Sequence, residues 1–199
     1  MKGPQDELHV DLLSASAHKL HGPKGVGMLY VRDGVALPPM IHGGSQESGR
    51  RAGTTNVAGI VGFGAAARLC REPMEKSMES TRALRDQLIE RLRAEVPHCS
   101  LNGHASRRLP GNVNVTIAGI DASEVRALLD GQGICVSTDS ACNAASPRPS
   151  HVLLAVGRSR TQAKGTLRLT LGDETTLEEV NRAADAVAQA ARSLSDLGL

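Results

Sequence analysis

Residues 16–19 read Ser16-Ala17-His18-Lys19, between the apolar stretch Val10 to Ala15 and the glycine-rich turn Gly22-Pro23-Lys24-Gly25-Val26-Gly27. This order predicts two short buried strands, Val10 to Ala15 and Gly27 to Val31, joined by a turn that carries Lys19. A lysine acts as an amine nucleophile in a confined site, and a strand ending in such a turn leaves space for a bulky aldehyde cofactor. Lys19 is therefore the candidate Schiff-base lysine. The alternative is a solvated loop lysine.

A second informative stretch, residues 137–147, reads STDSACNAASP and follows the apolar segment Ile134-Cys135-Val136. It places Cys142 among small and polar residues. A cysteine without bulky neighbours is accessible, as a thiolate nucleophile must be to reach a substrate and then a partner. Cys142 is the candidate nucleophile, and the alternative is an unpaired surface thiol.

Composition excludes several classes of function. The 199 residues carry a formal charge of +2, and they suffice for one good core or two small ones. Basic residues are scattered and the only aromatic residues are Tyr30 and Phe63, so nucleic-acid binding is not expected. The four cysteines form no CxxC pair, which argues against a metal site or a disulfide framework. With no signal peptide and no apolar run near the roughly 18 residues of a membrane span, we expect a soluble, cytoplasmic protein.

The rest of the chain predicts alternating helices and strands. An apolar helix is expected over residues 57–69, where three glycines suggest close packing, and an amphipathic helix over residues 74–96. Strands are expected around residues 113–117 and 167–171, the second with Arg168 and Thr170 opposite its leucines. We expect Ser123 to cap a short helix, and Thr176 with Glu179 to form the capping box of the last helix. This is an α/β or α+β pattern, with a domain boundary near Pro73.

Six motifs occur in a fixed order along nearly the whole chain. They are Ser16-Ala17-His18-Lys19 with its glycine turn, Gly43-Gly44-Ser45-Gln46-Glu47 with Arg51-Ala52-Gly53-Thr54, Gly111-Asn112-Val113-Asn114-Val115, Ser140-Ala141-Cys142, Pro149-Ser150-His151-Val152-Leu153, and Leu167-Arg168-Leu169-Thr170-Leu171-Gly172. In this order they resemble the pyridoxal-phosphate cysteine desulfurases of the NifS and IscS kind, within aminotransferase class V.

The resemblance implies the C-terminal part of a fold-type I pyridoxal-phosphate enzyme. Residues 1–73 would be the end of the large cofactor domain, and residues 74–199 the small α+β domain with the cysteine loop. The family carries its phosphate-binding loop, its ring-stacking histidine and the aspartate that faces the pyridine nitrogen before the lysine. Only 18 residues precede Lys19, and Asp6 and Asp11 are not convincing substitutes for that aspartate. The chain alone is therefore expected to bind the cofactor weakly and to have negligible activity.

The resemblance also assigns cofactor contacts. It makes Lys19 the Schiff-base lysine, and Ser16 and His18 contacts of the phosphate, a role that suits hydroxyl and imidazole donors. Thr54 matches a residue that reaches the phosphate bound by the other subunit, which implies a homodimer with shared sites. The alternatives are a core histidine at position 18 and, for Thr54, the cap of the helix that follows.

The implied activity is that of a cysteine desulfurase, which converts L-cysteine to L-alanine. Arg168 matches the arginine that pairs with the substrate carboxylate, and Cys142 matches the cysteine that takes up the sulfur as a persulfide. The sulfur would pass to an iron-sulfur scaffold or another acceptor protein, for iron-sulfur cluster assembly. Asp139 stands where the family usually has glycine, and a nearby carboxylate would raise the pKa of a cysteine thiol. Two alternatives remain open: a selenocysteine lyase, and a non-catalytic module that accepts persulfide or provides a dimer contact.

Overall fold

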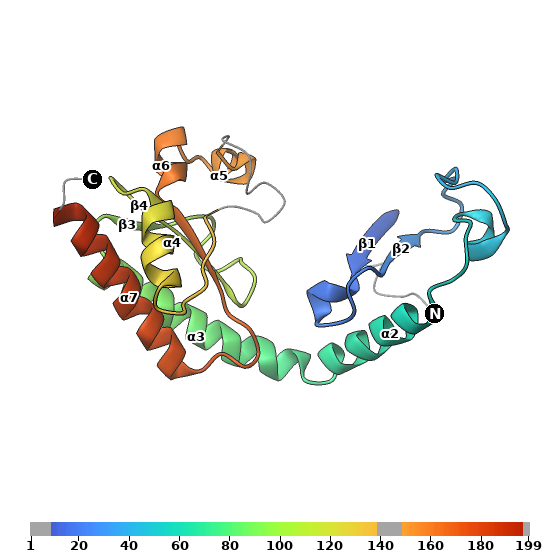
Figure 1. Ribbon diagram of the computed structural model, residues 1–199, viewed down its shortest axis with the longest axis horizontal. Helices are drawn as coiled ribbons and strands as arrows, with labels where there is room; N and C mark the ends of the chain where they lie inside the picture. The colour runs from blue at the N-terminus through green and yellow to red at the C-terminus, as the bar shows by residue number, and fades with distance from the viewer. Residues whose placement is uncertain (1–8, 139–148, 197–199) are drawn as a thin grey trace. The chain divides into compact units, whose positions relative to one another are not determined.

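The computed structural model describes residues 9–138 and 149–196 (Figure 1). The chain divides into two compact units, residues 1–74 (unit 1) and 75–199 (unit 2). Over the described ranges, no helix is both long and apolar enough to cross a membrane. The same ranges contain no group of three or more His, Cys, Asp or Glu side chains placed to hold a metal ion.

Unit 1 contains an antiparallel hairpin and one long helix. Strands β1 (Leu12–Ser16) and β2 (Gly27–Val31) pair along their whole length, and the one-turn helix η1 (Ala17–Leu20) follows β1 directly. A second 3-10 turn, η2 (Gln46–Gly49), precedes the helix α2 (Val57–Arg71). The predicted strands and helix are therefore confirmed, with ends that differ by one or two residues.

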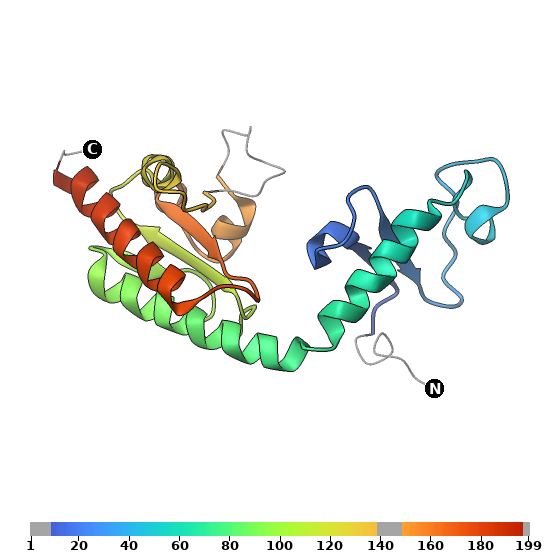
Figure 2. The same cartoon turned by 60° about the horizontal axis from the view of Figure 1, so that its bottom comes forward.

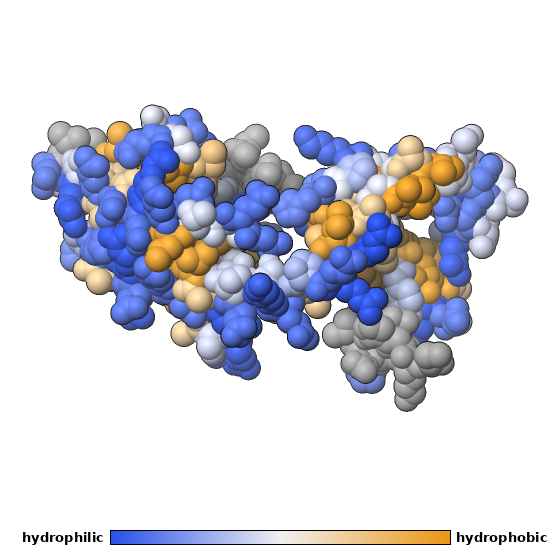
Figure 3. Space-filling model, turned by 90° about the horizontal axis from the view of Figure 1, so that it is seen from below, coloured by the Kyte–Doolittle hydropathy of each residue, from blue (hydrophilic) through white to orange (hydrophobic). Residues whose placement is uncertain are grey.

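The prediction that both strands of the hairpin are buried is wrong for this chain. Leu12 is 46% exposed and Leu29 is 52% exposed. In a two-stranded sheet both strands are edge strands. Their side chains are buried only where another element packs on a face of the sheet. Figure 3 shows exposed apolar surface, in orange, on unit 1, to which α2 also contributes through Val57, Val61 and Leu69.

The helix α2 begins at a cap that the sequence analysis did not select. The side-chain Oδ1 of Asn56 accepts a hydrogen bond from the Gly59 backbone N–H at 3.1 Å. Asn56 thus satisfies one of the free donors of the first turn. The alternative role of Thr54 as the helix cap is therefore excluded.

Unit 2 is a three-stranded antiparallel sheet with helices packed on it. The strand order is β3 (Cys99–Leu101), β4 (Asn112–Ile117), β5 (Thr166–Thr170). The helices are α3 (Met74–Glu95), α4 (Ala122–Asp130), α5 (His151–Ala155), α6 (Arg160–Lys164) and α7 (Leu177–Asp196). Figures 1 and 2 both show α3 and α7 side by side, and Arg91 of α3 donates to Asp185 of α7 at 2.6 Å.

The core of unit 2 follows the predicted alternation. Val113, Val115 and Leu167 are fully buried, and Leu92 of α3 and Val187 of α7 pack in the same cluster. Burial of such side chains is the main favourable term in folding. The amphipathic pattern of α3 and the period-2 pattern of β4 and β5 are therefore confirmed.

Polar side chains on the opposite face of β4 form a ladder of hydrogen bonds. The ladder links Asn102, which directly follows β3, with β4 and β5. The Asn102 Nδ2 donates to the Asn114 Oδ1 at 2.7 Å and to the Thr116 Oγ1 at 2.9 Å. The hydroxyls of Thr116 and Thr166 lie 2.8 Å apart. Buried polar groups stabilise a fold only when they are paired, as these are. Asn114 therefore contributes to the packing of the sheet through its side chain.

Two helix caps were predicted in unit 2, and one of them is wrong. The capping box of α7 is present, because Glu179 Oε2 accepts from the Thr176 N–H at 2.8 Å and Glu179 N–H donates to Thr176 Oγ1 at 3.2 Å. The cap of α4 is Asp121, not Ser123. Asp121 Oδ1 accepts from the Ser123 N–H at 2.9 Å and from its hydroxyl at 2.6 Å. These bonds lower the pKa of Asp121 below its ordinary value, since they favour the charged carboxylate.

We predict that Leu92→Ala destabilises unit 2 by about 2–5 kcal/mol, because it removes buried methyl groups and leaves a cavity. The matched control is Leu128→Ala, since Leu128 is 44% exposed whereas Leu92 is 0% exposed. The free energy of unfolding from urea titration measures both effects. Equal losses in the two variants would contradict the position of the core.

Candidate functional site

The lysine turn (residues 17–23) leads out of the end of β1. Ala17 is fully buried, whereas His18 and Lys19 are exposed. The Ala17 N–H donates to the Val26 carbonyl at 3.1 Å, and the Gly22 N–H donates to the Ala17 carbonyl at 2.9 Å. The buried alanine and these two bonds hold the turn closed. The side chains of His18 and Lys19 are thereby presented to solvent.

The donors of this turn fit a phosphorylated aldehyde. The Ser16 hydroxyl makes no capping bond to η1, and Lys19 is in none of the ion pairs found among the described residues. A hydroxyl, an imidazole and a primary amine therefore lie within four consecutive residues. Hydroxyl and imidazole groups bind phosphate oxygens, and an unpaired amine can react with an aldehyde.

Thr54 belongs to an exposed loop that precedes α2. The loop is tied back on itself where the Gly53 N–H donates to the Gln46 Oε1 at 3.2 Å. The Thr54 side chain is exposed, and Asn56 performs the capping of α2. The Thr54 hydroxyl therefore does not cap α2, and it is available to a ligand or a partner.

Arg168 lies in the middle of β5 and is half-buried. Its backbone pairs with Asn114 of β4 on one side and with Ser137 on the other. The Ser137 N–H donates to the Arg168 carbonyl at 3.0 Å, and the Arg168 N–H donates to the Ser137 carbonyl at 2.7 Å. Both backbone bonds of Arg168 thus go to Ser137, while its neighbours Leu167 and Leu169 pair with β4, and together these fix the position from which the guanidinium projects. A guanidinium can bind a carboxylate through two parallel hydrogen bonds.

The bridge to Ser137 also connects Arg168 with the predicted nucleophile along the chain. Cys142 and Asp139 lie outside the described residues. Among the described residues before them, Ser137 is held by the bridge to Arg168. Among those after them, Leu153 of α5 is buried. Sequence reasoning did not find the Ser137 bridge, because an isolated bridge of one residue pair leaves no periodic pattern.

The three described cysteines have different surroundings. Cys70 is half-buried in α2, and burial raises the pKa of Cys99 to about 11. Cys135 is exposed, although it lies in the apolar segment Ile134-Cys135-Val136. Its neighbours Ile134 and Val136 are half-buried and pack against the core. Because successive side chains of an extended segment point to opposite sides, Cys135 points outward.

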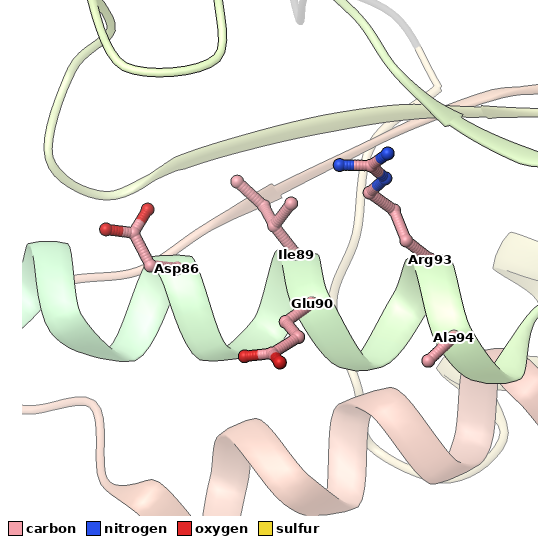
Figure 4. Close-up of a pocket in the computed structure, with 5 residues that line it drawn as sticks. All are labelled: Asp86, Ile89, Glu90, Arg93 and Ala94. Atoms are coloured by element: carbon pink, nitrogen blue, oxygen red, sulfur yellow. The ribbon is translucent and has the colours of Figure 1, made fainter.

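None of the candidate site residues that the structure describes lines either of two surface hollows. One hollow, of about 400 Å³, is lined by α3 alone: Asp86, Ile89, Glu90, Arg93 and Ala94. Figure 4 shows Asp86, Ile89 and Arg93 projecting from one side of α3 and Glu90 from the other. A second hollow of about 260 Å³ lies beside β5 and α7, and Cys135 contributes to it. Neither hollow is lined by Ser16, His18, Lys19, Thr54 or Arg168.

Comparison with known proteins identifies the family of this chain. Residues 2–183 match the family described as aminotransferase class-V. The chain belongs to this family. Among curated members, it is 48% identical to the cysteine desulfurase IscS of Dictyoglomus turgidum over 180 residues, which is 90% of this chain and 46% of the relative. It is 47% identical to the IscS of Methanosarcina thermophila over 191 residues, 96% of this chain and 47% of the relative.

Solved structures of family members match the fold. A NifS-like protein superposes with a TM-score of 0.84 at 36% identity, covering 95% of this chain and 48% of that one. The NifS-like protein of Rickettsia africae gives a TM-score of 0.84 at 28% identity, with coverages of 94% and 49%. The chain thus spans about half the length of the relatives it matches, and it has part of a fold-type I pyridoxal-phosphate enzyme.

The different surroundings of the cysteines predict different reactivities. Near neutral pH we expect iodoacetamide to modify Cys135 well before Cys99, because the thiolate is the reactive form and burial raises the pKa of Cys99 to about 11. As the pH rises toward that value, the thiolate fraction of Cys99 grows and its labelling should accelerate. Peptide mass spectrometry measures both sites. Equal labelling of the two cysteines near neutral pH would contradict the described burial.

Proposed function

We propose that this chain provides the lysine, arginine and nucleophilic cysteine of a pyridoxal-phosphate cysteine desulfurase. The proposal depends on the lysine turn, where Ser16, His18 and Lys19 offer three suitable groups at the end of one strand. The identity of 48% to a cysteine desulfurase supports it. Unit 1 would then belong to the large cofactor domain and unit 2 to the small domain.

The lysine turn would hold the cofactor. Ser16 and His18 donate hydrogen bonds to its phosphate, and Thr54 donates to the phosphate of the partner subunit in a homodimer. When bound, pyridoxal phosphate supplies an aldehyde that takes up an amine and a ring that withdraws electrons from the α-carbon. Lys19 carries a proton on Nζ to and from the carbon atoms of the substrate. An exposed, unpaired amine on a closed turn suits this task.

Arg168 would orient the substrate. Its guanidinium binds the carboxylate of L-cysteine through two parallel hydrogen bonds. Because the two bonds to Ser137 and the pairing of β5 with β4 hold its backbone, the guanidinium projects from a fixed position when the carboxylate arrives. Arg168 therefore contributes mainly to binding and orientation.

Cys142 would perform the sulfur transfer. Its thiolate attacks the sulfur of the substrate, so that a sulfur–sulfur bond forms while the bond between the substrate's Cβ and its sulfur breaks. The carbon fragment takes up protons and leaves as L-alanine. In total, one cysteine and the Cys142 thiol become one alanine and a Cys142 persulfide. The persulfide then passes its outer sulfur to an acceptor protein such as an iron-sulfur scaffold, in the cytoplasm.

The assignment of Lys19 predicts the site of covalent trapping. After co-expression of the chain with the N-terminal half of a cysteine desulfurase, incubation with pyridoxal 5'-phosphate and reduction with borohydride, we expect the pyridoxyl group on Lys19. Lys24 is an internal control, because it is also exposed and lies in the same glycine-rich segment. Mapping by peptide mass spectrometry distinguishes the two lysines. Modification of Lys24 in place of Lys19 would show that the assignment is wrong.

The assignment of Cys142 predicts a separation of two activities. Co-expressed with the N-terminal half of a cysteine desulfurase, the Cys142→Ala variant should lose persulfide formation from L-cysteine but keep trapping at Lys19, since the cofactor contacts lie in unit 1. Cys135→Ala is the matched control, because Cys135 is an exposed cysteine of the same unit, and it should keep both. Persulfide on Cys142→Ala at the level of the parent chain would remove Cys142 from the mechanism.

A further inference from the structure

One face of α2 contacts the lysine turn at three successive helical turns. The contacts come from Gly62, Ala66 and Cys70, which recur every four residues and therefore lie on one side of the helix. They meet Pro23, Gly22 and Leu20. The lysine turn thus packs along this face, which we call the α2 seat, and Figure 2 shows α2 passing beside the turn.

The contacts of Gly62 with Pro23 and of Ala66 with Gly22 depend on small residues. A Cβ added to Gly62 would lie 2.6 Å from Pro23 Cγ, and one added to Gly22 would lie 3.1 Å from Ala66 Cβ. The first distance is well inside van der Waals contact, so a side chain at position 62 forces the turn to move. Close packing of this kind transmits a shift of one element to its neighbour.

The third contact is a hydrogen bond. The Cys70 Sγ–H donates to the Leu20 carbonyl at 3.6 Å, and Leu20 directly follows Lys19. The next residue, His21, has a left-handed backbone with φ of 59°, which is unfavourable for a residue with a side chain. Cys70 therefore restrains the peptide at the point where the chain reverses direction.

The turn needs such external support. The helix η1 has only four residues, and a single helical turn is not stable by itself. Its first residue, Ala17, is held by the bond from its own N–H to Val26 and by the bond from Gly22. The α2 seat holds the other end of the turn, after Lys19.

We propose that Gly62, Ala66 and Cys70 are positioning residues for the Lys19 amine. They act through the backbone of residues 20–23 and do not touch the cofactor themselves. The inference rests on the proposed function for its catalytic meaning. The direction in which the Lys19 side chain leaves the turn is then set by a helix that comes about forty residues later in the chain.

Two glycines of the same helix provide the test. Gly62→Ala and Gly64→Ala add the same methyl group to α2, and both gain similarly in helix propensity. A Cβ at position 64 meets nothing within 4 Å, whereas one at position 62 meets Pro23. In Gly62→Ala we expect faster amide exchange at Gly22, and trapping of pyridoxal 5'-phosphate on Lys19 about tenfold slower. Gly64→Ala should match the parent chain in both measurements.

A second pair of variants tests the hydrogen bond. Cys70→Ala removes the donor and should slow trapping on Lys19 about threefold, whereas Cys70→Ser keeps a donor and should stay near the parent rate. Circular dichroism checks that each variant keeps its helices. If Gly62→Ala and Gly64→Ala show the same exchange and the same trapping rate, the proposal is wrong.

The exchange measurement separates this inference from the proposed function. If the parent chain, co-expressed with the N-terminal half of a cysteine desulfurase, shows no trapping on Lys19, the proposed function fails. Faster exchange at Gly22 in Gly62→Ala alone would in that case still establish that the α2 seat holds the turn, and equal exchange in both glycine variants would overturn it.

Discussion

Burial of the apolar side chains of β4 and β5 against α3 and α7 is the interaction on which unit 2 depends. Val113, Val115 and Leu167 leave no exposed surface, and Leu92 meets them from the helix layer. The opposite side chains of the same strands are polar, and the ladder from Asn102 to Thr166 pairs those that are buried. Arg168 therefore projects from a strand whose position is determined by the core, and the bridge to Ser137 extends this support toward the cysteine segment.

Unit 1 obtains order at Lys19 in a different manner. Its hairpin exposes apolar side chains, so it has no sheet core comparable to that of unit 2. The lysine turn is held instead by local hydrogen bonds and by close contact with α2. The two units thus support their site residues by different means: a packed sheet under Arg168, and a helix beside Lys19.

The sequence was sufficient to predict features that depend on periodic or adjacent residues. The alternation in β4 and β5, the amphipathic α3 and the capping box of Thr176 with Glu179 are such features. Features that depend on contacts between residues far apart in the sequence were not predictable. Apolar residues of the hairpin indicate a tendency to be buried, but not which segment covers them. The exposure of Cys135 and the contact between Cys70 and Leu20 are of the same kind, and Cys142 lies outside the described residues.

The strict alternation of β5 has a consequence for how this site can evolve. A shift of one residue in the pairing of β5 with β4 would exchange the two faces of the strand. Leu167 and Leu169 would then face outward, and the charge of Arg168 would enter the core. An insertion or deletion in β5 would therefore lower the folding stability and also displace the Arg168 guanidinium. A substitution at the exposed Thr170 is therefore easier for the fold to accommodate than a change in the length of β5.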